Sequence, residues 1–233
     1  SNFVSETTRE LLSLGDRHIE VLPNPVDVKK FKPITEKAEQ PGLIVFVGTV
    51  CEKKGVRQLV EAMPQIVAAK PEAELWIVGR DSVDPESGHS YSNQLRLTIP
   101  VRLQKQILFK GPIEHTELPS LLSQASVCVY PSHMEALPIA WIEGMAMGKA
   151  IAASKTGPGS EVISHGESGL LCDPHNPGSI AQEIIRLLDD KELRQRLGKG
   201  ARQRAEQNFS LDVLIARNEA FYERCLSGRM HGA

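Results

Sequence analysis

Cysteine is scarce in this sequence, and the few cysteines are far apart. Four occur in 233 residues, at positions 51, 128, 172 and 225, and none forms a Cys-x-x-Cys pair. Small secreted domains depend on dense disulfide frameworks, and zinc sites need closely spaced cysteine and histidine ligands. The spacing therefore argues against both classes and favours a reducing compartment. No metal site is implied.

Long apolar runs and an excess of one charge are also missing. No run approaches the roughly 18 to 20 residues of a membrane helix, and the first residues do not resemble a signal peptide. The 27 basic and 29 acidic residues leave a net charge of −2, without the basic stripe that nucleic-acid binding requires. We therefore expect a cytoplasmic globular protein that binds no nucleic acid.

What the sequence does contain is a regular alternation of apolar patterns. Short runs typical of buried strands occur at 43–48, 74–79, 107–109, 127–130 and 150–153. Between most of them apolar residues recur at helical spacing, as at Leu59, Met63 and Ile66. This alternation predicts βαβ units, which build a parallel sheet with helices on both faces. We predict a Rossmann-like α/β fold whose ligands bind beyond the carboxyl ends of the strands.

The remaining segments frame this predicted sheet. Residues 80–106 are longer than a simple crossover, and we predict a polar loop followed by a helix broken near Pro100. Further amphipathic helices are predicted after the sheet. The domain is expected to span residues 1–233, with 1–40 as a linker segment leading into it and 207–233 as a trailing helix.

Two glutamates eight positions apart, Glu135 and Glu143, lie on either side of a predicted helix start. Pro138 fits the first helical position, where its fixed φ and missing N–H cost least. In a continuous helix the two glutamates would be separated by about 12 Å of rise. Because the helix begins between them, both carboxylates can face one ligand.

The start of this helix is also a predicted phosphate site. The amides of Ile139, Ala140 and Trp141 are expected to lack intrahelical partners and to form a positive, donor-rich end. Acidic side chains beside an anion site call for an explanation.

A second set of residues follows the first predicted strand. Gly48 ends that strand at a place where the backbone turns sharply or approaches a ligand. Lys53 and Lys54 then occupy a predicted helix start, where the helix dipole disfavours each cation by about 0.3 to 1 kcal/mol. This cost indicates an anionic ligand at the same edge of the sheet.

These features together resemble a known family. The Glu135 and Glu143 spacing is similar to the E-x7-E motif of retaining nucleotide-sugar glycosyltransferases with two Rossmann domains, the family 4 group of the GT-B type. Segments in family order are VLPNPVDVKKFKP (21–33), FVGTVCEKKGVRQLVEAM (46–63), ELWIVG (74–79), ILFKGPI (107–113) and SEVISHGESGLLCDP (160–174). The resemblance covers nearly the whole chain and implies the carboxyl-terminal, donor-binding half of such an enzyme.

The resemblance also implies a reaction and its partners. The complete enzyme would move a hexosyl group from a UDP-, GDP- or ADP-linked sugar to an acceptor hydroxyl with retention of configuration, in polysaccharide or glycolipid synthesis. No cofactor or metal is implied. The partner would be an amino-terminal acceptor domain, which is absent from this chain and could carry a peripheral membrane contact. The fragment alone is expected to be inactive.

The resemblance gives individual residues their roles. It implies that Lys54 contacts the donor diphosphate and that Glu135 lies beside the donor sugar, and these two are the predicted catalytic residues. It implies that Glu143 accepts hydrogen bonds from the ribose hydroxyls and that the backbone of Ile113 faces the nucleobase. The predicted donor-binding residues are Gly48, Thr49, Lys54, Ile113, Leu137, Ile139, Ala140 and Glu143.

Two departures from the family pattern keep an alternative open. Thr49 stands where the family usually has arginine, and residues 136–138 replace Gly-Phe-Gly. Our hypothesis is that Arg57 or Lys53 partly compensates for the missing cation. The alternative is a catalytically weakened nucleotide-sugar binding module with a regulatory or assembly role. A non-hydrolysing sugar-nucleotide epimerase of the same architecture is a distant third.

Overall fold

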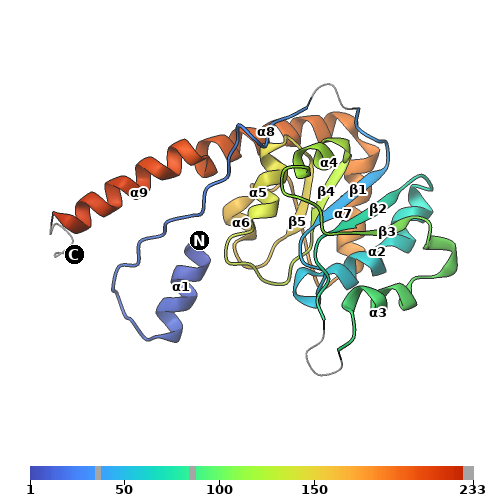
Figure 1. Cartoon of the computed structure of the whole chain (residues 1–233), viewed down its shortest axis with the longest axis horizontal. Coiled ribbons are helices and arrows are strands. Elements are labelled where there is room, and N and C mark those ends of the chain that lie inside the picture. Colours follow the sequence, from blue (N-terminus) through green and yellow to red (C-terminus); the bar gives the residue numbers. More distant parts are fainter. Residues whose placement is uncertain (35–37, 84–87, 228–233) are drawn as a thin grey trace.

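Six parallel strands form the sheet at the centre of the computed structural model, in the order β3-β2-β1-β4-β5-β6 (Figure 1). The structure describes residues 1–34, 38–83 and 88–227. Parts of the predicted linker (35–37), polar loop (84–87) and trailing helix (228–233) lie outside the described residues. The strands are β1 Leu43–Val47, β2 Glu74–Val78, β3 Ile107–Gly111, β4 Val127–Tyr130, β5 Ile151–Ser154 and β6 Leu170–Cys172.

The predicted parallel sheet is confirmed, with one strand more than the pattern gave. The five expected runs correspond to β1 through β5, and each pair of neighbouring strands is parallel. For example, Val45 in β1 lies opposite Trp76 in β2 on one side and Cys128 in β4 on the other. The sixth strand, β6, has only three residues. A run this short gives no recognisable period, and it forms a strand because β5 offers it a parallel edge.

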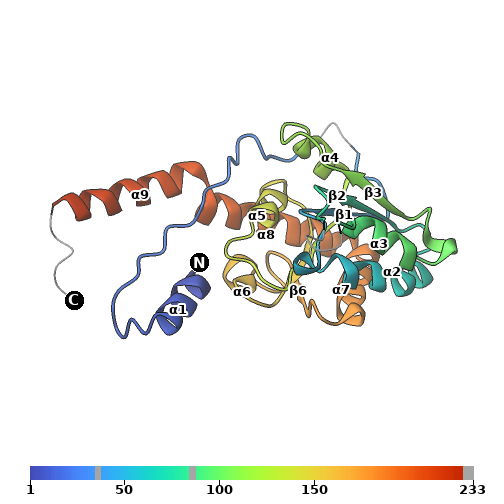
Figure 2. The same cartoon turned by 60° about the horizontal axis from the view of Figure 1, so that its bottom comes forward.

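Helices cover both faces of the sheet, as predicted (Figure 2). The alternation of side chains along β1 explains how, because Ile44 and Phe46 face one buried cluster while Leu43 and Val45 face the other. The first cluster is completed by α2 (Val56–Ala69) and α7 (Pro177–Asp189), and the second by α4 (Leu118–Gln124), α5 (Ile139–Ala146) and much of α8 (Lys191–Phe209).

The connections include four shorter elements. The helix predicted before Pro100 is present as α3 (Tyr91–Thr98), and the turn η2 (Val101–Leu103) follows the proline, so the predicted break is confirmed. The turn η1 (Glu52–Lys54) follows β1, and the short helix α6 (Gly159–Val162) follows β5. Both η1 and α6 lie beyond the carboxyl ends of their strands.

Two helices at the ends of the chain extend away from this body (Figures 1 and 2). Helix α1 (Asn2–Leu11) lies within the predicted linker, and its first two amides donate to the Glu161 carboxylate over 2.7 and 2.6 Å. Helix α9 (Leu211–Leu226) begins later than the predicted trailing helix, because α8 continues to Phe209.

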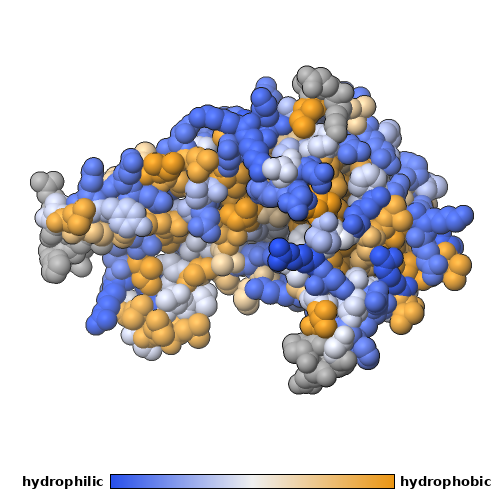
Figure 3. Space-filling model, viewed as in Figure 1, coloured by the Kyte–Doolittle hydropathy of each residue, from blue (hydrophilic) through white to orange (hydrophobic). Residues whose placement is uncertain are grey.

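Both end helices expose apolar side chains, which Figure 3 shows as orange patches on its left side. The exposed residues are Val4, Leu11, Leu12, Val213, Ile215, Tyr222 and Leu226. In the described part of the chain, no helix is both long enough and apolar enough to cross a membrane.

Candidate functional site

A cavity of about 300 Å³ lies where the sheet changes its winding direction, between β1 and β4. The chain leaves β1 toward β2 and leaves β4 toward β5, so the two loops diverge and open a crevice at their carboxyl ends. The lining residues are Phe46, Val47, Gly48, Thr49, Lys54, Tyr130, Ser132, Glu135, Leu137, Pro138, Ile139, Ala140 and Trp141.

The structure brings most of the predicted site residues together at this cavity. Those that line it are Gly48, Thr49, Lys54, Glu135, Leu137, Ile139 and Ala140. Ile113 and Glu143 are not among the lining residues. Ile113 is half-buried against the same apolar cluster as Leu137 and Ile139, and Glu143 lies farther along α5. Both are therefore on the cavity's side of the sheet.

Lys54 and Glu135 form an ion pair inside the cavity. Lys54 Nζ lies 2.6 Å from Glu135 Oε1, and the two side chains are only 27% and 11% exposed. Lys54 ends η1, and Gly55 then turns into α2 with a left-handed φ of 69°. Limited exposure strengthens this pair relative to a surface ion pair. The two predicted catalytic residues are therefore direct neighbours.

The start of α5 differs by one residue from the prediction. Pro138 is the N-cap, with a non-helical ψ of 88°, and the helix begins at Ile139. The prediction that Pro138 occupies the first helical position is therefore wrong. Its carbonyl accepts the amide of Trp141 at 3.1 Å, so Trp141 is not a free donor. Among the described residues, the Ile139 and Ala140 amides have no backbone acceptor.

Glu143 is almost completely buried, one helical turn beyond the Ile139 amide. Only 6% of the residue is exposed, and its Oε1 lies 2.7 Å from Nε2 of His115. The other ring nitrogen, Nδ1, lies 2.9 Å from Lys30 Nζ. Burial raises the pKa of Glu143, and the hydrogen bond from His115, together with the charge that this imidazole carries when it is protonated, opposes this increase. The carboxylate is thus held by a side chain that the sequence did not indicate.

We predict that Glu143→Gln stabilises the folded chain at neutral pH. Burial raises the folded-state pKa of Glu143 above the ordinary 4.5, so the folded chain binds this proton more tightly than the unfolded chain does. The protonated carboxyl therefore contributes its full stability below pH 4.5, and this contribution is lost as the pH rises through the folded-state pKa. Glutamine keeps an acceptor for His115 but has no charge to bury. We expect a gain of up to about 2 kcal/mol. Denaturant unfolding across pH measures it, and a difference that does not shrink in acid contradicts this explanation.

The cations proposed to replace the missing arginine do not line the cavity. The Arg57 guanidinium is held by Glu52 at 2.6 and 3.0 Å and by Glu61 at 3.0 Å, and it holds the pKa of Glu52 at about 2. Lys53 is exposed. Of the described residues that line the cavity, Lys54 is the single cation. The hypothesis that Arg57 or Lys53 compensates for Thr49 therefore has no geometric support in this conformation.

Several cavity residues were not predicted. The stacked rings of Tyr130 and Trp141, with centroids 6.1 Å apart, form part of the wall, and Ser132 lies nearby. Trp141 is only 1% exposed, so it packs in the core as well as lining the cavity. The sequence did not mark the aromatic residues as part of a binding site, because a large apolar side chain more often belongs to the core.

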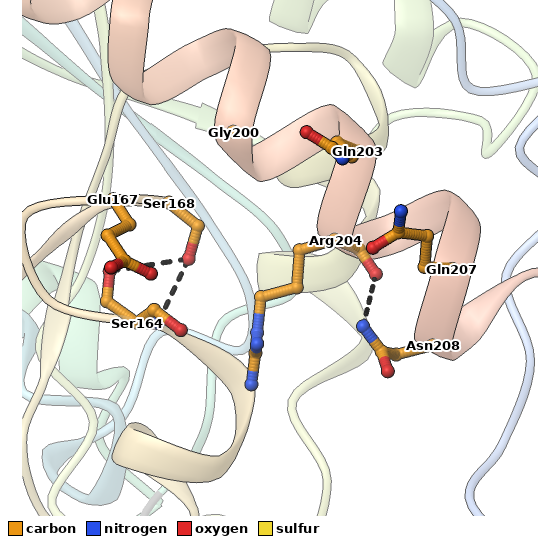
Figure 4. Close-up of a pocket in the computed structure, with 8 residues that line it drawn as sticks. All are labelled: Ser164, Glu167, Ser168, Gly200, Gln203, Arg204, Gln207 and Asn208. Carbon is orange, nitrogen blue, oxygen red and sulfur yellow. Dashed lines mark hydrogen bonds between the residues drawn. The ribbon is translucent and has the colours of Figure 1, made fainter.

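A second hollow of about 220 Å³ lies between the 164–168 loop and α8 (Figure 4). Arg204, which lines it together with the acidic Glu167, donates to the carbonyls of Glu161 and Val162 at 2.7 and 2.8 Å. None of the predicted site residues lies there. Across the described ranges, no cluster of His, Cys, Asp and Glu could hold a metal ion.

Comparison with known proteins identifies the family of this chain. The profile of the family described as "Glycosyl transferases group 1" matches residues 27–204. A Corynebacterium glutamicum relative, a GDP-mannose-dependent phosphatidylinositol monomannoside mannosyltransferase, is 29% identical over 228 residues, which cover 89% of this chain and 57% of the relative. The chain spans about half to three fifths of the curated relatives it matches.

Solved structures share the fold. Sucrose-phosphate synthase from Thermosynechococcus elongatus superposes with a TM-score of 0.86 and 26% identity, over 98% of this chain and 57% of that one. HepE from Anabaena, solved in complex with UDP and glucose, gives a TM-score of 0.77 and 21% identity, over 89% and 56%. The family profile matches well over half of the chain, and the chain belongs to the group 1 glycosyltransferases.

Proposed function

We propose that this chain is the donor-binding half of a retaining glycosyltransferase that moves a hexosyl group from a nucleotide diphosphate sugar to an acceptor hydroxyl. The observation that carries the proposal is that Lys54 lines one cavity together with Ile139 and Ala140, the first two residues of α5, whose amides have no backbone acceptor among the residues that the structure describes. A cation and the amides of a helix N-terminus are the groups that bind phosphate oxygens. The Anabaena structure with UDP and glucose supports this reading.

The nucleoside would lie along α5 from the diphosphate. Glu143 follows Ile139 by four residues, a rise of about 6 Å. A carboxylate offers paired acceptor oxygens to the two ribose hydroxyls. Ile113, in the loop after β3, would present its backbone to the base. Uracil, guanine and adenine all suit backbone recognition, and the Corynebacterium relative is named for GDP-mannose.

The chemistry would be mainly electrostatic. The bond between the anomeric carbon and the diphosphate oxygen breaks, the acceptor oxygen bonds to that carbon on the same face, and the acceptor proton passes to the leaving diphosphate. Lys54 and the two amides would stabilise the leaving charge, an effect of a few kcal/mol where single donors are removed. Glu135 would orient sugar hydroxyls or stabilise positive charge at the anomeric carbon, with Gly48, Thr49 and Leu137 closing the cavity around the donor.

An amino-terminal acceptor domain is the proposed partner of residues 1–233. The exposed apolar side chains on α1 and α9 are a surface that another domain could cover. The chain's coverage of about half of its relatives agrees with this division. By itself the chain would bind donor weakly and transfer nothing, because the acceptor wall of the active site is missing.

The alternative, a binding module with weakened catalysis, is favoured by one observation. Thr49 supplies no charge, and the one cation in the described cavity lining, Lys54, is already paired with Glu135. The leaving group would then receive less stabilisation than in a typical relative. Transfer from radiolabelled nucleotide sugars, measured on protein that carries both domains, separates the two: an absence of transfer and hydrolysis with any common donor rules out the enzyme.

Calorimetry of this chain against UDP, GDP and ADP tests the proposed donor site. We expect at least one diphosphate to bind, and a chelator to leave the affinity unchanged. If none of the three binds, the assignment of the cavity is wrong. If chelation abolishes binding, the metal-free mechanism is wrong.

A further inference from the structure

A chain of two hydrogen bonds connects three separate parts of the sequence beside the cavity. Lys30 precedes β1, His115 lies in the loop after β3, and Glu143 lies on α5. Lys30 Nζ is 2.9 Å from His115 Nδ1, and His115 Nε2 is 2.7 Å from Glu143 Oε1. The Phe31 ring lies against the imidazole, with ring centroids 5.2 Å apart. His115 is therefore held on two sides.

The partners of His115 determine where its proton lies. An ammonium group has protons to donate and no lone pair to accept, so Nδ1 of the neutral imidazole accepts from Lys30. The ring proton must then be on Nε2, which donates to Glu143. The Glu143 side chain is only 8% exposed, whereas the His115 side chain is 60% exposed. Solvent exposure therefore increases from the carboxylate to the imidazole.

This hydrogen bond also fixes the plane of the carboxylate. The terminal torsion of a glutamate side chain is broad, so rotamer preference alone leaves the directions of the two oxygens undefined. An N–H donor on Oε1 selects one plane, and Oε2 then has a defined direction. Side chains that orient a ligating group in this way change affinity about 10- to 100-fold at metal sites.

We propose that His115 is a positioning residue that sets the Glu143 carboxylate for the ribose hydroxyls of the nucleotide, and that Lys30 selects the His115 tautomer. The inference rests on the proposed function, because Glu143 is the proposed ribose ligand. The inference adds that the preference of the site for ribose over deoxyribose depends on His115, which lies in the loop after β3 and not on α5. A purely structural role for His115 would instead stabilise Glu143 equally in the presence of either sugar.

The test compares ribose with deoxyribose. Calorimetry measures the affinity of the chain for UDP, GDP and ADP, and for a deoxynucleotide that offers Glu143 neither hydroxyl, the 2′,3′-dideoxy form of the nucleotide that binds best. We expect the wild type to prefer the ribonucleotide. His115→Ala should weaken ribonucleotide binding about 10- to 100-fold and leave deoxynucleotide binding nearly unchanged. His115→Gln keeps an N–H donor and should recover most of the preference.

A matched control exists in the linker. His18 Nε2 lies 2.9 Å from Glu20 Oε2, in a second histidine–glutamate pair outside the cavity, so His18→Ala should change neither affinity. Circular dichroism confirms that each variant is folded. If folded His115→Ala keeps the wild-type preference for ribose, the inference is overturned and the proposed function stands. If no nucleotide binds to the wild type, the proposed function fails.

The tautomer can be read without any nucleotide. Nitrogen-15 chemical shifts of His115 at mildly alkaline pH should report a proton on Nε2 in the wild type. Lys30→Met removes one of the two partners that favour this tautomer, so the fraction of His115 with its proton on Nδ1 should rise. A proton on Nδ1 in the wild type, or no change in Lys30→Met, overturns the inference whatever the result with nucleotides.

Discussion

Lys54→Met should weaken nucleoside diphosphate binding about 10- to 150-fold, the range expected for loss of a charge-assisted hydrogen bond worth about 1.5 to 3 kcal/mol. Among the described lining residues, Lys54 is the single cation, so no neighbour replaces its charge. The two amides at the start of α5 remain and should retain a weak site. Calorimetry with UDP, GDP or ADP measures the loss.

The same substitution should also destabilise the chain. Glu135 is 11% exposed and would lose its partner at 2.6 Å. Leaving a largely buried acceptor unpaired costs about 1 to 3 kcal/mol. Adding Glu135→Gln removes the unpaired charge, so the double variant should regain most of the stability and none of the diphosphate affinity.

Lys53→Met is the matched control, because Lys53 is the adjacent lysine, is exposed and does not line the cavity. It should bind diphosphate nearly as the wild type does. If Lys54→Met retains wild-type affinity while Lys53→Met loses it, Lys53 is the phosphate cation and the role given to Lys54 is wrong.

The order of the helices and strands could be predicted from the sequence, because each element has its own pattern of apolar residues. A run such as LIVFV is long enough to identify a buried strand, and helical spacing between the runs fixes the crossover type. From these, the sheet and its carboxyl edge follow. Gly48, Lys54 and the start of α5 also had a local signal, whereas Thr49 and Leu137 were indicated only by the family resemblance. That the loops after β1 and β4 meet depends on the strand order, which no local pattern states.

The details of the site depend on contacts that no local pattern records. His115 lies 28 positions before Glu143, and nothing in that spacing indicates a hydrogen bond. Arg57 was offered as a compensating cation, but Glu52 in η1 binds its guanidinium, a contact that the spacing of the two residues does not indicate. The Pro138 carbonyl accepts the amides of both Trp141 and Ile142 at the start of α5, a detail of the first helical turn that the sequence does not state.

Gly55→Ala should strongly destabilise the chain beside the cavity. Gly55 has a φ of 69°, and a Cβ there would lie 1.9 Å from the Pro131 carbonyl oxygen, which belongs to the chain directly after β4. The left-handed conformation costs about 1 to 2 kcal/mol, and overpacking adds about 1 to 3 kcal/mol. We expect a total loss of about 2 to 5 kcal/mol in the free energy of unfolding, measured by denaturant titration.

Substitutions at two other glycines measure the conformational cost and the steric clash one at a time. Gly166 has a φ of 81° with nothing within 4 Å of a Cβ, so Gly166→Ala should show the conformational cost alone. Gly200, inside α8, would place a Cβ 2.1 Å from the Glu167 carbonyl oxygen, so Gly200→Ala should show the clash, offset by about 1 kcal/mol of helix propensity.

Gly55 also affects the cavity, because it allows η1 to pack closely against the loop after β4. Its close approach to Pro131 brings η1 against the loop after β4, where the His133 amide also donates to the Lys53 carbonyl at 2.9 Å. A side chain at position 55 would push Lys54 away from Glu135 and from the start of α5. Folded Gly55→Ala should therefore lose diphosphate affinity, whereas Gly166→Ala should not. Equal stability and affinity in the two variants would show that the η1 contact does not position Lys54.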